Sequence, residues 1–431
     1  MKKIMKTIGL NNKLVVKNTF FSLASKFMAI ILYMLTDIML VNILDINDYG
    51  KWSYIFSVLT ILCGIVRFGE NNSTRVFIVC ADDENKRNSF LNAGFVLRIL
   101  ISSCMCSIFF IAINIWAIFF EKNNMFWNQI SYIKFGLLYV FFNTFSEFYK
   151  EINIAYNNFK RIFIITLLEY GGYFALSFIF LNIFSKRIEK PIYGVEVGYI
   201  IALLVVTIFG TYWARNDGLN LLKKIDVNKI KEIFRYALPI LCVSLGAIFL
   251  TEMDTIMIGI LQNNNEVAVY SVAKKISNKS SNLNMAICAS VMPQFAVITR
   301  ENKNKKKKKF RKIIILNGII AGGVILCYVF IFPMFIIKLY GSKYYASIYI
   351  LRILAVYYFF ETMTDFMGML LEYQKKAKMR SIFYFIMVIC NLGMNYILIP
   401  KYGAIGAAIA TSISMIPYMG FLIYECRKIF K

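Results

Sequence analysis

The feature of this sequence that most limits its fold is a succession of apolar stretches, each long enough to cross a lipid bilayer. One crossing helix needs about 20 predominantly apolar residues. Twelve such stretches occur, near residues 18–43, 50–67, 91–119, 131–153, 162–184, 191–213, 236–261, 268–298, 313–338, 346–371, 379–399 and 403–424. The pattern predicts an all-α polytopic membrane protein with twelve transmembrane helices.

Composition agrees with this prediction and excludes a soluble protein. Hydrophobic residues make up 59% of the chain, and the mean hydropathy is +0.61. A soluble globule of 49.9 kDa could not cover so much apolar surface. The opening MKKIMKTIGL is basic and polar, and no small-residue cleavage site follows it, so we expect no cleaved signal peptide. The 9 cysteines form no metal-like CxxC pair and the chain has 0 histidines, so we predict no metal site and no cofactor.

A polar connector divides the apolar stretches into two sets of six. It covers residues 214–235, and we predict that it is a cytoplasmic linker between an N-terminal lobe at 1–213 and a C-terminal lobe at 236–431. The first helix of each lobe carries an acid in a similar context, since TDIMLVNIL at 36 aligns with MDTIMIGIL at 253. This alignment pairs Asp37 with Asp254. Two homologous halves, with sites at their interface, are typical of transporters.

Basic residues predict the orientation in the membrane, because cytoplasmic loops retain Lys and Arg. Of the 49 basic residues, 35 lie at the termini and in alternate connectors, whereas 9 lie in the opposite connectors. We therefore expect both termini in the cytoplasm. One connector, SKRIEKP at 185, is discordant. The run ENKNKKKKKFRK at 301 is compatible with nucleic-acid or anionic-lipid binding, but a loop that fixes topology explains it more simply. No nucleic-acid partner is predicted.

Charged residues within the apolar stretches are the candidate functional residues. Each costs roughly 2.5 to 3.5 kcal/mol at the centre of a membrane helix, so it should face a cavity or another polar group. Helical spacing places four polar residues on one face of the first helix and four on one face of the eighth. These are Ser22, Lys26, Tyr33 and Asp37, then Ser271, Lys275, Lys279 and Asn282. The cationic face of the eighth helix needs water or an anion, and Arg352 adds a charge on the tenth.

Structural roles for the same residues stay open at this point. Lys275 could reach the membrane interface by snorkelling, and Lys26 could form a buried pair with an acid on another helix. Asp37 and Asp254 stand near the outer ends of their helices, where a carboxylate could serve only helix packing. Three further acids, Glu147, Glu169 and Glu196, have no assignable partner from sequence alone.

Several motifs resemble one known family in both content and order. The segments YGSKYYASIYILRILAVYYFF at 340 and NLGMNYILIPKYGAIGAAIATSIS at 391 are similar to the second half of polysaccharide flippases of the Wzx type, which handle O-antigen or capsule. LDINDYGKWSYIFSV at 44, ALPI at 237 and VMPQF at 291 also follow the family's order. These flippases belong to the multidrug/oligosaccharidyl-lipid/polysaccharide (MOP) exporter superfamily. The resemblance implies twelve helices in two pseudo-symmetric six-helix lobes around a central cavity.

The resemblance also implies a function. A flippase of this type moves undecaprenyl-diphosphate-linked oligosaccharide repeat units from the inner to the outer leaflet of the bacterial cytoplasmic membrane by alternating access. We predict that Lys26, Lys275, Lys279 and Arg352 form a cationic cavity for the diphosphate, because Lys and Arg both bind phosphate. Asp37 and Asp254 are the predicted gating or ion-coupling residues. The expected partners are the lipid-linked oligosaccharide diphosphate, membrane lipids and other polysaccharide assembly proteins.

Two other classes of protein compete with this interpretation. An ion-coupled multidrug exporter of the same superfamily would use acids inside the membrane, and this chain has such acids. An enzyme is disfavoured, because the longest outer connector, EKNNMFWNQI at 121, has no room for a catalytic domain. The sequence also contains no phosphate-binding Gly-rich loop and no His-based site, so no catalytic residue is predicted.

Overall fold

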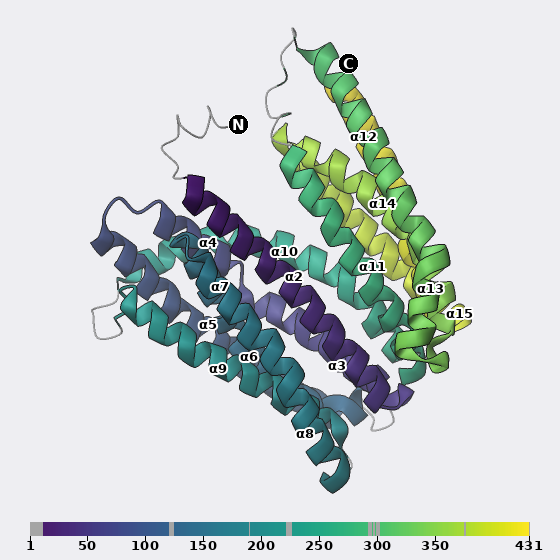
Figure 1. Ribbon diagram of the computed structural model, residues 1–431, viewed down its shortest axis with the longest axis horizontal. Helices are drawn as coiled ribbons and strands as arrows, with labels where there is room; N and C mark the ends of the chain where they lie inside the picture. The colour runs from purple at the N-terminus through teal and green to yellow at the C-terminus, as the bar shows by residue number, and fades with distance from the viewer. Residues whose placement is uncertain are drawn as a thin grey trace. The chain divides into compact units, whose positions relative to one another are not determined.

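The chain is helical throughout the part that the structure covers. The computed structural model describes residues 12–119, 125–188, 190–220, 226–291, 295, 298, 302–374 and 376–430, and these contain helices and turns but no strand (Figure 1). They form two compact units. Unit 1 is Met1–Ile43 with Val58–Ile248, and unit 2 is Leu44–Ser57 with Phe249–Lys431. The division therefore falls inside two continuous helices, α3 (Ile46–Arg67) and α10 (Val227–Leu261).

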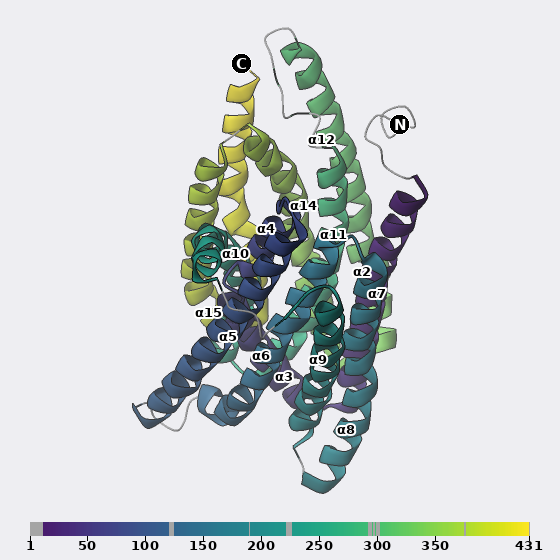
Figure 2. The ribbon, with the colours of Figure 1, turned by 90° about the vertical axis from the view of Figure 1, so that its left-hand side faces the viewer.

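Unit 1 is a helical bundle in which α6, α8 and α9 pack together. The elements that lie wholly in this unit are α2 (Asn12–Ile43), α4 (Glu70–Val79), α5 (Glu84–Phe119), α6 (Met125–Ala155), α7 (Phe159–Thr166), the π turn η1 (Leu167–Gly171), α8 (Gly172–Ile188) and α9 (Pro191–Asn216). Helices α8 and α9 run side by side (Figure 2). Glycines four residues apart permit this approach, because a Cβ on Gly194 or Gly198 would lie 2.7 or 2.5 Å from backbone atoms of α8.

Unit 2 is built around α14 (Ala346–Tyr373), which packs against α11, α12 and α15 (Figure 1). Its remaining elements are α11 (Asn264–Val291), α12 (Lys303–Leu326), η3 (Cys327–Ile331), α13 (Phe332–Phe335), η4 (Ile336–Tyr340), η5 (Ser342–Tyr344) and α15 (Ala377–Ile429). In the most apolar part of α14, 56% of residues are buried, whereas in the most apolar part of the span Lys303–Tyr340, which begins with α12, 17% are buried. Helix α14 is therefore central, and α12 presents most of its apolar side chains outward.

The first turns of α3 and α11 meet in unit 2. The side-chain amide of Asn264 donates a hydrogen bond to Asn47 Oδ1 at 2.6 Å. Gly50, in the first turns of α3, lies directly on the backbone of Asn264, since a Cβ at Gly50 would fall 1.8 Å from that carbonyl oxygen. Only glycine fits this contact.

Among the described residues, the twelve predicted crossing segments are helical, except that the eighth, predicted to reach 298, ends as α11 at Val291. Helix α15 extends over 53 residues, but Gly403 (φ 57, ψ −138) breaks it into the two segments predicted near 379–399 and 403–424. By length and composition alone, 8 helices of the described residues can span a membrane, with α15 counted once. Helices α6, α10 and α11 have comparable length but are not among the 8. The predicted all-α polytopic fold is confirmed.

The lobe boundaries predicted at 213 and 236 stay a prediction. Part of the predicted linker, residues 221–225, lies outside the residues that the structure describes.

Candidate functional site

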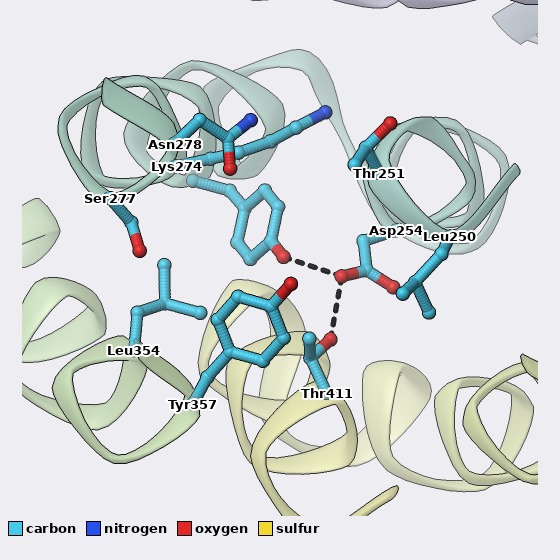
Figure 3. Close-up of a pocket in the computed structure, with 10 residues that line it drawn as sticks. Leu250, Thr251, Asp254, Lys274, Ser277, Asn278, Leu354, Tyr357 and Thr411 are labelled. Atoms are coloured by element: carbon cyan, nitrogen blue, oxygen red, sulfur yellow. Dashed lines mark hydrogen bonds between the residues drawn. The ribbon is translucent and has the colours of Figure 1, made fainter. Parts of the chain in front are cut away.

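Asp254 lies at the centre of a buried polar cluster in unit 2. Its side chain, on α10, is 2% exposed. One carboxylate oxygen accepts a hydrogen bond from Asn395 Nδ2, and the other accepts from the Tyr270 hydroxyl, each at 2.6 Å. Thr411 Oγ1 is also 2.6 Å from the second oxygen (Figure 3). A buried carboxylate of this kind depends on such donors, because burial of an unpaired charge is very costly.

The broken helix α15 supplies two of the three donors, one from each side of Gly403. Asn391 and Asn395 are one turn apart before the break, and Thr411 lies two turns after it. The side-chain amide of Asn395 contacts Asn391 Oδ1, and that of Asn391 contacts Thr411 Oγ1, each at 3.2 Å. The cluster therefore joins the two segments of α15 to the carboxylate on α10.

Two side chains after α10 hold the break in α15. Gln262 Nε2 donates to the carbonyl of Ile399 at 2.8 Å, and Glu266 Oε2 accepts from the backbone N–H of Ala404 at 2.8 Å. The acid thus caps the start of the second segment, where the helix dipole favours a negative charge. Since Gln262 and Glu266 follow α10 directly, they fix α15 relative to Asp254.

A small pocket, partly open to the surface, adjoins Asp254. The lining residues come from α10, α11, α14 and α15, and they include Thr251, Tyr270, Lys274, Asn278 and Tyr357 (Figure 3). Lys274 Nζ donates to Glu252 Oε2 at 2.7 Å and to Thr255 Oγ1 at 2.9 Å, so an acid balances its charge. The oxygens gathered around Asp254 come from a carboxylate, amides and hydroxyls, which are groups that bind a proton or a hard cation.

Lys275, a predicted cavity residue, is half-buried in unit 2. Its Nζ donates to the Tyr49 hydroxyl at 3.0 Å and lies 4.9 Å from the centre of the Tyr49 ring. Tyr49 itself is fully buried and makes an edge contact with Tyr344 at 5.8 Å. An aromatic ring therefore supports this cation. The side chain of Lys279, one turn further along α11, lies outside the described residues.

The other two predicted cations lie in different surroundings. Arg352 is exposed on α14 between Tyr349 and Val356, which are 47% and 50% exposed, and its guanidinium reaches the carbonyl of Val329 at 3.5 Å. Lys26 is exposed on α2 of unit 1, beside Phe27. In unit 2, Lys275 and Arg352 thus contact different groups. A shared cationic lining formed by the four residues stays a prediction.

Asp37 is buried on α2, with 4% of its side chain exposed. Both acids that were predicted to be equivalent are thus inside their units, Asp37 in unit 1 and Asp254 in unit 2. Their roles in gating or ion coupling are untested.

Unit 1 contains a second ionic cluster, which was not predicted from the sequence. Lys150 Nζ lies 2.9 Å from Glu147 Oε1 and 2.7 Å from Glu169 Oε2, and the Ser146 hydroxyl also donates to Glu169. Glu169 is 1% exposed and belongs to the π turn η1. Helical spacing relates only residues of the same helix, so it could not pair Glu169 with Lys150 on α6. Glu196, the third unassigned acid, is also 1% exposed.

The fold is that of a MOP superfamily transporter. The chain superposes on an inward-facing multidrug resistance transporter of the MATE family with a TM-score of 0.75 and 17% identity, over 94% of this chain and 98% of that one. A MOP superfamily transporter from Pyrococcus furiosus, described as having a binding pocket of reverse polarity, gives a TM-score of 0.61 and 14% identity over 97% and 96% of the two chains. At these identities the likeness defines the fold alone.

Matches to models of sequence families define more closely the class of protein to which this chain belongs. A model of the family described as polysaccharide biosynthesis protein matches residues 15–299, which is more than half of the chain, and a MatE family model matches residues 239–397. The probable low-salt glycan biosynthesis flippase Agl15 of Haloferax volcanii is 24% identical over 227 residues, which are 52% of this chain and 46% of that protein. The match thus spans less than half of that relative. The chain belongs to the polysaccharide biosynthesis protein family, and the resemblance noted from its motifs is confirmed.

Proposed function

We propose that this protein is a flippase that moves undecaprenyl-diphosphate-linked oligosaccharide repeat units from the inner to the outer leaflet of a bacterial cytoplasmic membrane. The observation that carries the proposal is the match to the polysaccharide biosynthesis family over residues 15–299. The flippase Agl15, similar over about half of this chain, supports the same substrate class. The basic residues predict that both termini lie in the cytoplasm.

The chemical problem is the diphosphate, which cannot cross hydrocarbon unaided because charge is costly there. Lys275 is the cation that best fits a role in lowering this barrier, since it is held in the membrane by the ring and hydroxyl of Tyr49 rather than at an exposed surface. We include Lys26, Lys279 and Arg352 in the same cationic lining. Alternating access, in which the lobes rock around the headgroup, would then expose this lining to each leaflet in turn.

Ion coupling is the proposed role of Asp254, with Asp37 as its counterpart in the other half. A carboxylate that accepts hydrogen bonds from α11 and from both segments of α15 joins three helices through one charge. Binding of a proton or a small cation there would change these contacts together, which couples occupancy to helix position.

The test uses a strain that lacks its own flippase and receives variants of this chain. We expect Lys275→Ala to abolish surface polysaccharide at normal protein levels and to cause lipid-linked repeat units to accumulate on the inner leaflet. Lys275→Arg should keep part of the activity. The matched control is Lys401→Ala, which removes an exposed cation after the first segment of α15. Unchanged surface polysaccharide after neutralisation of Lys26, Lys275, Lys279 and Arg352 together would reject the cationic lining.

An ion-coupled multidrug exporter is the alternative function. The MatE match over residues 239–397 and the fold shared with multidrug transporters favour it. Purified protein that exports cationic dyes from vesicles, and that does not move a diphosphate lipid, would establish the alternative.

A further inference from the structure

Helix α12 begins with a strongly basic segment, residues 303–312. Residues 302–312 contain no acid. Six of its cations are exposed: Lys305, Lys307, Lys308, Lys309, Arg311 and Lys312. Two more exposed cations, Arg427 and Lys428, lie near the end of α15. The sequence favoured a topology-fixing loop at 300–312, but the structure is helical from Lys303 onward.

This basic segment is fixed to unit 2 through an aromatic contact. Phe310 is 5% exposed, and its ring lies 5.5 Å from the ring of Phe295 and 5.4 Å from that of Phe430. Lys307 Nζ also approaches the Phe430 carbonyl at 3.5 Å, and Lys306 Nζ lies 5.7 Å from the Phe295 ring. The exposed cations are therefore carried by an anchored helix, and little conformational freedom would be lost when they bind a ligand.

The basic segment stands where a lipid headgroup layer is expected. Large apolar side chains become exposed immediately after it, with Ile315, Leu316 and Ile319 at 55%, 57% and 66%. Such side chains in a membrane protein face the acyl chains. With a rise of about 1.5 Å per residue, Lys312 lies roughly 5 Å and Lys308 roughly 10 Å along the axis from Ile315. The headgroup region adds about 5 to 8 Å to each side of the hydrocarbon core, so the cations overlap it.

We propose that the basic segment of α12 binds the headgroups of anionic phospholipids in the adjacent leaflet. Its charge is complementary to phosphodiester groups, and its position beside lipid-facing residues favours a lipid over a nucleic acid. Basic residues near an anionic membrane surface each contribute about 1 kcal/mol, or roughly fivefold in affinity. This site does not depend on which molecule the protein transports.

The experiment measures lipid association with the full-length protein. Purified protein is reconstituted in phosphatidylcholine bilayers that contain a trace of spin-labelled phosphatidylglycerol or phosphatidylcholine, and the motionally restricted fraction of each lipid is recorded. We expect wild-type protein to associate with phosphatidylglycerol about five times more strongly than with phosphatidylcholine. In a variant with Lys305, Lys308, Lys309 and Lys312 replaced by Gln, the ratio should fall to about 1, whereas Arg at the same positions should preserve it.

The matched control removes four exposed cations from unit 1. Lys160→Gln, Arg215→Gln, Lys231→Gln and Arg235→Gln together should leave the ratio near its wild-type value. A wild-type ratio near 1, or an equal loss in the control, would overturn the proposal. Retention of a single-stranded RNA oligomer by wild-type protein in neutral lipid, lost in the α12 variant, would also overturn it in favour of nucleic-acid binding.

Discussion

Exchange of Asp254 and Asn395 for one another separates a structural role of the Asp254 cluster from a role in transport. Asp254 accepts three hydrogen bonds, each at 2.6 Å. In Asp254→Asn alone, these contacts are made to a neutral amide instead of a charged carboxylate. Hydrogen bonds to charged groups exceed neutral ones by roughly 1 kcal/mol, so we expect a loss of about 3 kcal/mol. Asn395→Asp alone sets a second carboxylate against the first. Like charges about 4 Å apart in a dielectric near 20 repel by about 4 kcal/mol, which is an upper bound because a proton can be taken up.

The double exchange restores one carboxylate and one amide at the same contact. The contacts from Tyr270 and Thr411 still go to a neutral amide, so we expect a loss of about 2 kcal/mol, whereas the two single losses add to about 7 kcal/mol. The measurement is thermal unfolding of purified protein in detergent. For 431 residues, 1 kcal/mol corresponds to roughly 1 °C in Tm, so the single variants should lose about 3 and 4 °C and the double variant about 2 °C, well below the sum of about 7 °C.

Transport should respond differently from stability. The exchange moves the charge from α10 to α15, and the proposed coupling requires it on α10. We expect surface polysaccharide to stay absent in the double variant although its Tm recovers. A double variant whose Tm falls by the sum of the single losses would refute the contact geometry, and recovery of transport together with Tm would refute the coupling role.

Three further predictions test other parts of the structure. Gly50→Ala should destabilise the protein by about 3 kcal/mol or more, because the added Cβ clashes with the backbone of Asn264. Gly393→Ala, which has open space around it, should not destabilise the protein, and thermal unfolding compares the two variants. Lys150→Met should cost about 3 to 5 kcal/mol, because it leaves Glu147 and Glu169 without their shared cation, and an unchanged Tm would show that the cluster is solvated. A single cysteine at Asn304 in a Cys-free chain should resist an impermeant thiol reagent in intact cells, whereas one at Lys401 should react, and the opposite pattern would reverse the predicted topology.

The sequence was sufficient to predict the helices and one member of the candidate site. Apolar stretches of spanning length are a local property of the sequence. Asp254 was recognisable because a carboxylate in such a stretch is costly unless polar groups surround it. Its partners Asn395 and Thr411 are 141 and 157 residues away along the chain, and only the tertiary fold brings them together. Helical spacing could align Lys275 with its neighbours on α11 but could not show that Tyr49 would support it.

The contact between Asn47 and Asn264 bears on the origin of the two halves. These residues are 217 positions apart, which is the separation of Asp37 from Asp254 in the alignment of the halves. Each residue thus touches its own counterpart. In a symmetric homodimer, a residue meets its own copy only on the twofold axis. Given the homology of the halves that the alignment predicts, the Asn–Asn hydrogen bond is the contact expected if two identical half-length subunits were joined into one chain.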